Sequence, residues 1–249
     1  MLEVCVEDAG GLQAAIVGGA DRVELCSALP LGGLTPSAAL MEAAAQAPVP
    51  VHVLLRPRAG DFLYDAAEEE LISADLQRAA AGGLAGVVIG ASRRNGELDV
   101  PLLARLIACA REAAEKRAAP LSLTLHRAFD LCPDPVASLE QAISLGFDRV
   151  LTSGGAATAM AGRTVLAALV SRARGRIRIL AGGGINPHDV GAILSTGVDE
   201  VHASCRVALE EPDPKLVELG FVDAHPKRTD ASRVAALITA MNSWRQTNI

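Results

Sequence analysis

The chain has 249 residues, of which half are hydrophobic and only 2% aromatic, and its formal net charge at pH 7 is −6. This length is enough for one large domain with a full core. The acidic balance and the absence of any run of Lys or Arg argue against a nucleic-acid-binding or membrane-binding surface. No stretch of eighteen apolar residues occurs, so we expect no membrane-spanning helix.

The cysteines are odd in number and widely spaced, which predicts free thiols in a reducing compartment rather than a disulfide framework. The N-terminus lacks the basic start and the long apolar stretch of a signal peptide, so we expect a cytoplasmic protein. No Cys-x-x-Cys or His-x-x-x-His pair occurs, and a preformed structural zinc site is therefore not expected. The five cysteines are Cys5, Cys26, Cys109, Cys132 and Cys205.

Strand patterns and helix patterns alternate along the chain. The clearest strand is 120–126, where Ser122, Thr124 and His126 alternate with leucines, because a period of two places them on one face. Strands are expected at 2–6, 21–26, 51–55, 86–90, 120–126, 148–152, 177–181 and 199–202. Helices are expected at 11–18, after a cap at Thr35 or Ser37, and at 66–81, 100–117, 135–145, 162–174, 187–196 and 230–244.

Eight strands, each followed by a helix, favour parallel pairing with right-handed crossovers. In a domain of this length, the pattern predicts a closed (β/α)₈ TIM barrel that spans 1–249 as a single domain. The one long irregular stretch is 210–228, which contains Pro212, Pro214 and Pro226. We expect it to be a loop on the rim that carries the functional residues.

The strand alternation predicts which side chains point into the barrel. The outer face must pack under helices and be apolar, as Leu2, Val4 and Val6 are, while the inner face can be polar near the carboxyl ends. We expect Glu24 and Arg56 to form an ion pair there, because an unpaired buried charge is costly. The inward residues expected at the mouth are Glu3, Cys5, Glu7, Glu24, Cys26, His52, Arg56, His126, His202 and Ser204.

Several motifs resemble the copper homeostasis protein CutC family. They run in family order from the first strand to the sixth, and 182–184 and 200–204 fit as well. The sequence departs from the family at Ala59, where a glycine is usual, and in the tail over 205–228. The motifs are Glu3-Val-Cys5, Gly-Ala-Asp-Arg-Val-Glu-Leu-Cys at 19–26, Gly-Gly-Leu-Thr-Pro-Ser at 32–37, Arg-Pro-Arg-Ala-Gly-Asp-Phe-Leu-Tyr at 56–64, His-Arg-Ala-Phe-Asp at 126–130 and Leu-Thr-Ser-Gly at 151–154.

The resemblance implies a cytoplasmic TIM barrel linked to copper tolerance, in which Cys5 and Cys26 are the proposed copper(I) ligands. The two residues occupy matching Glu-x-Cys positions on neighbouring expected strands, and soft thiolates select copper(I). The alternative is that both are small hydrophobic core residues, which is a common role for free cysteine.

A second interpretation is an enzyme that acts on a small phosphorylated or anionic metabolite. TIM barrels often bind phosphate in the loops after strands seven and eight, which here contain Gly183, Gly184, Ser204 and Arg206. A triple glycine alone is weak evidence, since it also occurs in turns that bind no ligand. His202, on the eighth strand, would line the same site.

The enzyme interpretation assigns acid–base roles to Glu24 and His126, because a carboxylate and an imidazole exchange protons near neutral pH. Asp130 would orient His126 or bind a metal. Arg56, Arg58 and Arg127 would bind substrate charge, although each could instead hold loops together. A third class, a scaffold that acts by assembly, stays open, because the small residues of the helices would permit a homo-oligomer.

Overall fold

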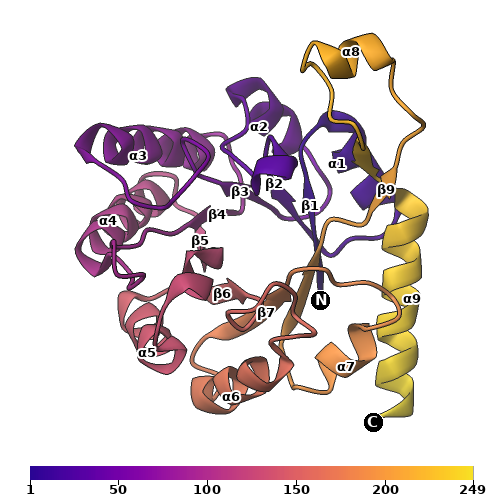
Figure 1. Ribbon diagram of the computed structural model, residues 1–249. Coiled ribbons are helices and arrows are strands. Elements are labelled where there is room, and N and C mark those ends of the chain that lie inside the picture. The colour runs from indigo at the N-terminus through magenta and orange to yellow at the C-terminus, as the bar shows by residue number, and fades with distance from the viewer. Residues whose placement is uncertain (249) are drawn as a thin grey trace.

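Eight short strands close into one parallel barrel in the computed structural model, which describes residues 1–248 (Figure 1). Each strand pairs with the next one in sequence, and β8 pairs with β1 to close the ring. The predicted (β/α)₈ barrel is confirmed. The strands are β1 Leu2–Val6, β2 Arg22–Leu25, β3 Val51–Leu54, β4 Gly86–Ile89, β5 Ser122–Leu125, β6 Arg149–Thr152, β7 Arg178–Gly182 and β8 Glu200–Ala203.

The helices form the outer ring, and local capping signals set their ends (Figure 1). Helix α3 begins at a capping box, in which the side chains of Asp65 and Glu68 each accept a hydrogen bond from the backbone N–H of the other residue. Helix α5 ends at Gly146, whose φ of 88° suits glycine. Both helices have the predicted bounds. The ring consists of α1 Ala9–Val17, α2 Ala38–Ala44, α3 Ala66–Ala81, α4 Val100–Lys116, α5 Pro135–Leu145, α6 Arg163–Ala173, α7 Val190–Leu194 and α9 Ala231–Thr247.

Helix α7 begins three residues later than the expected start at Pro187. The side chain of Asn186 accepts hydrogen bonds from the backbone N–H groups of His188 and Asp189, at 2.9 and 3.1 Å. This turn takes up the backbone donors that a first helical turn would otherwise present. The segment between β7 and α7 is therefore a loop.

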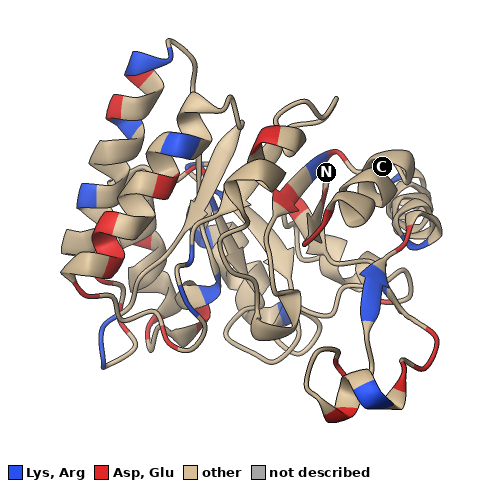
Figure 2. Cartoon of the chain, turned by 90° about the horizontal axis from the view of Figure 1, so that it is seen from above, with Lys and Arg blue, Asp and Glu red and all other residues tan. Residues whose placement is uncertain are grey.

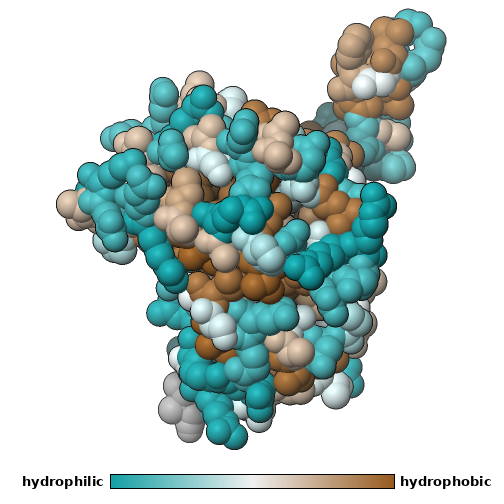
Figure 3. Space-filling view, turned by 90° about the vertical axis from the view of Figure 1, so that its left-hand side faces the viewer, coloured by the Kyte–Doolittle hydropathy of each residue, from teal (hydrophilic) through white to brown (hydrophobic). Residues whose placement is uncertain are grey.

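The stretch after β8 is not the plain loop that the prolines predicted. Strand β9 (Arg206–Ala208) pairs antiparallel with β10 (Lys227–Thr229), and the short helix α8 (Pro214–Glu218) lies between them. Figure 3 shows this arm projecting from the body of the protein, with apolar surface near its tip. Phe221 in the arm is 76% exposed.

The core has two layers, as the strand alternation predicted. Outward-facing residues such as Leu2, Val4 and Val6 are fully buried against the helices. Inside the barrel, a second and smaller cluster consists of Cys5, Cys26, Leu54 and Val88.

Figure 2 shows the charges of both signs distributed mainly over the helices and loops. Within residues 1–248, no helix has the length and apolar character needed to cross a bilayer.

Below the small cluster, the barrel interior holds a buried network of charges. Arg22 forms ion pairs with both Glu3 and Glu200, and Arg149 Nε lies 3.2 Å from Glu200 Oε2. All four side chains are at least 95% buried. Two carboxylates face two guanidinium groups, so this part of the interior is close to charge balance.

Candidate functional site

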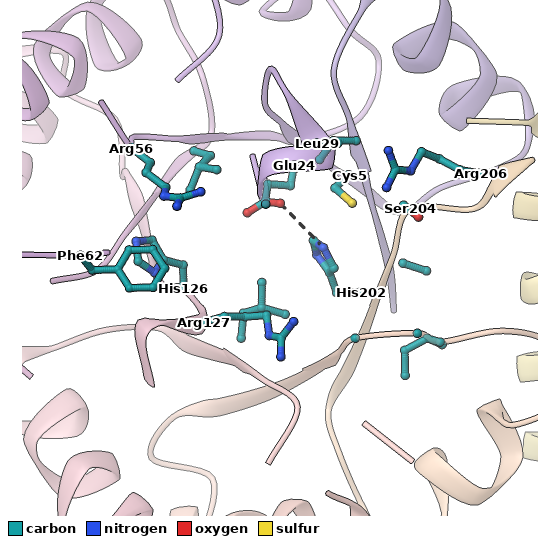
Figure 4. Close-up of a pocket in the computed structure, with 17 residues that line it drawn as sticks. Cys5, Glu24, Leu29, Arg56, Phe62, His126, Arg127, His202, Ser204 and Arg206 are labelled. Atoms are coloured by element: carbon teal, nitrogen blue, oxygen red, sulfur yellow. Dashed lines mark ion pairs between the residues drawn. The ribbon is translucent and has the colours of Figure 1, made fainter. Parts of the chain in front are cut away.

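The carboxyl ends of the strands surround a cavity of about 250 Å³ (Figure 4). Polar and charged side chains from distant parts of the sequence converge on it. They come from β1, β2, β8 and β9 and from the loops that follow β3, β5 and β8. The lining includes Cys5, Glu24, Arg56, His126, His202 and Arg206.

Three neighbouring strands bring a thiol, a carboxylate and an imidazole together at the floor of this cavity. Cys5 on β1 is level with Glu24 on β2, and His202 on β8 is level with Glu3 on β1. The ligand atoms of Cys5, Glu24 and His202 all lie within 4.8 Å of one another, and all three residues are buried. We call this group the floor triad.

The imidazole of His202 is held in a fixed orientation. Its Nδ1 lies 2.8 Å from Oε1 of Glu3, and its Nε2 lies 3.7 Å from Oε2 of Glu24 (Figure 4). Burial would lower the pKa of His202, but Cys5, Glu3 and Glu24 outweigh it and raise the pKa. The pKa of Glu3 is lowered, because the hydrogen bond from His202 and the charge of Arg22 outweigh the opposing effect of burial.

Glu24 does not form the predicted ion pair with Arg56. Its carboxylate faces His202 and the thiol of Cys26, whose Sγ lies 3.5 Å from Oε2. Burial raises the pKa of Glu24. Arg56 instead donates to backbone carbonyls, at 2.8 Å to Leu31, 2.9 Å to Gly33 and 2.7 Å to Gly60.

The two cysteines predicted as copper ligands have different surroundings. Cys5 lines the cavity, whereas Cys26 is 1% exposed and packs against Leu54 and Val88 inside the barrel. Burial raises the pKa of the Cys26 thiol well above its ordinary value, and nearby Glu24 adds to the effect. The floor triad therefore contains one of the two thiols.

His126 lines the opposite wall, as predicted, with its ring 4.7 Å from the Phe62 ring, centre to centre. Its Nδ1 accepts a hydrogen bond from the Ala128 N–H at 3.0 Å, and its buried Nε2 has no partner among the described residues. Burial, followed by the positive charge of Arg56, lowers the pKa of His126 to about 3. The imidazole is therefore neutral at pH 7.

Asp130 does not orient His126, contrary to our expectation. Its carboxylate holds the loop after β6, where it accepts from Thr152 Oγ1 and from the backbone N–H groups of Ser153 and Gly155, at 3.1 and 3.0 Å. The guanidinium of Arg127, which lines the cavity, also pairs with it at 2.7 Å.

Arg58 lies away from the cavity, so its predicted contact with substrate is not supported. It forms ion pairs with Glu68 and Asp61 and donates to the Leu63 carbonyl at 2.6 Å. These contacts tie the loop after β3 to the first turn of α3. Of the predicted arginines, Arg56, Arg127 and Arg206 line the cavity and Arg58 does not.

Gly183, Gly184 and Ser204 line the cavity, as predicted. The two glycines have φ values of +106° and +72°, which side-chain-bearing residues rarely adopt. Sequence reasoning missed Phe62, which lies in the loop after β3, and it did not recognise that Glu3 positions His202. Strand alternation placed Glu3 inside the barrel, but it carried no information about the partner on β8.

Comparisons with known proteins agree with this architecture. The model of the CutC family matches residues 1–207. A CutC protein of Sinorhizobium medicae is 50% identical, covering 98% of this chain and 96% of the relative, and one of Caulobacter vibrioides is 46% identical over 98% and 97%.

Two solved structures have a similar fold. CutC of Streptococcus agalactiae, described as a candidate copper homeostasis protein, is 30% identical with a TM-score of 0.75, covering 82% of this chain and 98% of that one. Thiamine phosphate pyrophosphorylase of Pyrococcus furiosus is 15% identical, covering 98% and 96%, and with a TM-score of 0.59 it shares the fold alone. The family match and the two relatives together establish that this chain belongs to the CutC family.

Proposed function

We propose that this protein acts in copper homeostasis by binding copper(I), as cargo, at the floor of the cavity. The ligands would be Sγ of Cys5 and Nε2 of His202. The observation that carries this proposal is the floor triad, in which the ligand atoms of Cys5, Glu24 and His202 lie within 4.8 Å of one another. Copper(I) favours soft thiolate ligands, and imidazole is a common second ligand for copper.

The Glu3 carboxylate supports the assignment of His202. Metal-binding histidines usually donate their second ring N–H to a carboxylate or carbonyl, which fixes the ring and makes the free nitrogen more basic. Glu3 accepts in this way from Nδ1 at 2.8 Å, and Nε2 is turned toward Cys5 and Glu24. Copper(I) would displace the protons of the thiol and of Nε2, so its binding would release protons.

Cys26 is a supporting residue in this proposal. It packs in the same small cluster as Cys5, and its thiol faces Glu24 rather than the cavity. For Cys26 to act as a third copper(I) ligand, its thiol would have to turn away from the Glu24 carboxylate. We also propose a cytoplasmic location, because all five cysteines are free, which suits a reducing compartment.

The test is an anaerobic titration of copper(I) against a chromophoric chelator. The wild-type protein should bind one equivalent, and Cys5→Ser and His202→Gln should each weaken binding by roughly a hundredfold or more. Cys109→Ser, which removes a half-buried thiol on α4, is the matched control and should bind like wild type. Wild-type affinity in the Cys5→Ser, His202→Gln double variant would refute the proposal.

The second function that we propose is acid–base catalysis, and the properties of Glu24 support it. A buried carboxyl group with a raised pKa that faces a cavity is suited to donating and accepting protons. His126 would enter such a reaction as a neutral imidazole. Incubation with a metabolite extract should show a compound consumed by the wild type and spared by Glu24→Gln. Consumption at the same rate by both proteins would remove Glu24 from the mechanism.

A further inference from the structure

Arg56 carries a buried positive charge that no carboxylate of residues 1–248 balances. The residue is 5% exposed, and its hydrogen bonds within the described chain go to the carbonyls of Leu31, Gly33 and Gly60. Its Nε is buried without a partner. Buried charges are normally paired, since desolvation costs several kcal/mol per ion, roughly. The missing counter-charge therefore points to something that binds in the cavity beside it.

More positive than negative side chains line the cavity, although the protein is acidic. Three arginines, Arg56, Arg127 and Arg206, line it, and among its described lining residues the only acid is Glu24. The full chain carries a net charge of −6. A concave site of one sign with low-dielectric walls concentrates the field and attracts ions of the other sign.

One side of the mouth offers donors that are not used within the protein. Among the described residues, the buried Nε of Arg206 has no partner, and the nearest acid to its guanidinium is Glu7, at 3.8 Å from Nη1. Ser204, two residues before Arg206, lies beside it (Figure 4), and Gly183 and Gly184 complete this side of the lining. Both glycines have positive φ, a backbone conformation in which successive N–H groups can form an anion-binding concavity.

The remaining walls are apolar, which indicates that the ligand has an organic body. Phe62, Leu54, Leu151 and Ile185 line the cavity. Small-molecule sites typically combine apolar walls with a few convergent polar groups. A bare inorganic ion would leave these walls in contact with water.

We propose that the cavity binds a small organic anion, with a phosphate monoester or carboxylate group held by Arg206, Ser204 and the Gly183–Gly184 backbone. Arg56 supplies the unbalanced positive charge, whereas the charge of Arg127 is already paired with Asp130. The apolar body of the ligand then extends over the floor triad. This site goes beyond copper(I) binding and does not depend on it, because none of its anion-binding groups belongs to the floor triad.

The test is calorimetric titration of the full-length protein with inorganic phosphate and, separately, with acetate, at constant ionic strength in chloride. We expect binding of at least one anion with a Kd of about 1 mM, since one group held by a few charge-assisted hydrogen bonds gives affinity of this order. Arg206→Met should weaken binding by about tenfold. Arg78→Met, on an exposed arginine of α3, is the control and should leave binding unchanged.

Binding of phosphate alone supports a phosphate ester, and binding of acetate alone supports a carboxylate. No heat with either anion, or equal affinity in wild type and Arg206→Met, overturns the anion site. Cys5→Ser separates the two proposals, because it should lose copper(I) and keep the anion. Should wild type bind copper(I) but neither anion, only the anion site is refuted.

Discussion

The Nδ1 atom of His202 lies 2.8 Å from Oε1 of Glu3, although 199 positions separate the two residues in the sequence. The contact exists because β8 pairs with β1 when the barrel closes, which places Glu3 and His202 level with each other. Closure of the fold and orientation of the proposed copper ligand therefore depend on the same pair of strands.

We predict that Glu3→Gln destabilises the protein by about 3–5 kcal/mol, because removing one member of a buried ionic network leaves Arg22 without a full counter-charge. Urea unfolding measures the loss. The control is Glu112→Gln, which breaks an exposed pair with Lys116 on α4 and should leave the stability nearly unchanged. Equal stability of the two variants would contradict the role given to the network.

The lowered pKa of His126 predicts that the free energy of unfolding falls at acid pH. Its pKa is about 3 in the folded protein and 6.5 in an ordinary environment, so below pH 6.5 the unfolded chain takes up a proton that the folded protein does not. Stability should therefore be unaffected by this group above pH 6.5. It should decrease as the pH falls toward 3, by up to about 1.4 kcal/mol per pH unit.

Urea unfolding midpoints at pH 7 and pH 5 test this dependence. His126→Gln should reduce the difference between the two midpoints, and so should His52→Gln, because burial also lowers the pKa of His52 to about 3. His188→Gln is the control, since that side chain is 96% exposed. If His126→Gln has the same pH dependence as the wild type, the pKa of His126 is not lowered in the folded protein.

Gly90→Ala should displace the imidazole of His126. A Cβ at position 90 would lie 2.5 Å from both Cε1 and Nδ1 of that ring, closer than real Cβ atoms approach. We expect a loss of about 1–3 kcal/mol, typical of overpacking in a well-packed interior. A crystal structure of the variant should show the ring turned away from Phe62. A ring in its original position, with wild-type stability, would contradict close packing of Gly90 against His126.

Asp130→Asn should loosen the loop after β6 without changing copper(I) affinity. The carboxylate accepts from the backbone N–H groups of Ser153 and Gly155, and an amide is a weaker acceptor for several donors at once. Hydrogen exchange of those two amides should become about tenfold faster. Unchanged exchange, combined with weakened copper(I) binding, would instead place Asp130 in the metal site.

The fold could be predicted from the sequence because its signals are local. Alternation, caps and terminal glycines define each strand and helix, and α3 and α5 have the predicted ends. The arm after β8 could not, because a five-residue helix and two three-residue strands carry too little periodicity.

The composition of the site was only partly predictable. Alternation correctly placed Cys5, Glu24, His126 and His202 inside the barrel. It did not predict which of these residues are level with each other. That depends on the stagger between strands, which puts Glu24 beside His202. Arg56 lies beyond the end of β3, where the nearby carbonyls, and not Glu24, receive its hydrogen bonds.

The measurement that tests the copper(I) site most directly is a copper K-edge X-ray absorption spectrum of the copper(I)-loaded protein. Coordination by Cys5 and His202 predicts one sulfur and one nitrogen neighbour, with the sulfur lost in Cys5→Ser and the nitrogen lost in His202→Gln. Cys26→Ser should leave the spectrum unchanged. Two sulfur neighbours without nitrogen, one of them lost in Cys26→Ser, would contradict this account and assign copper(I) to the cysteine pair.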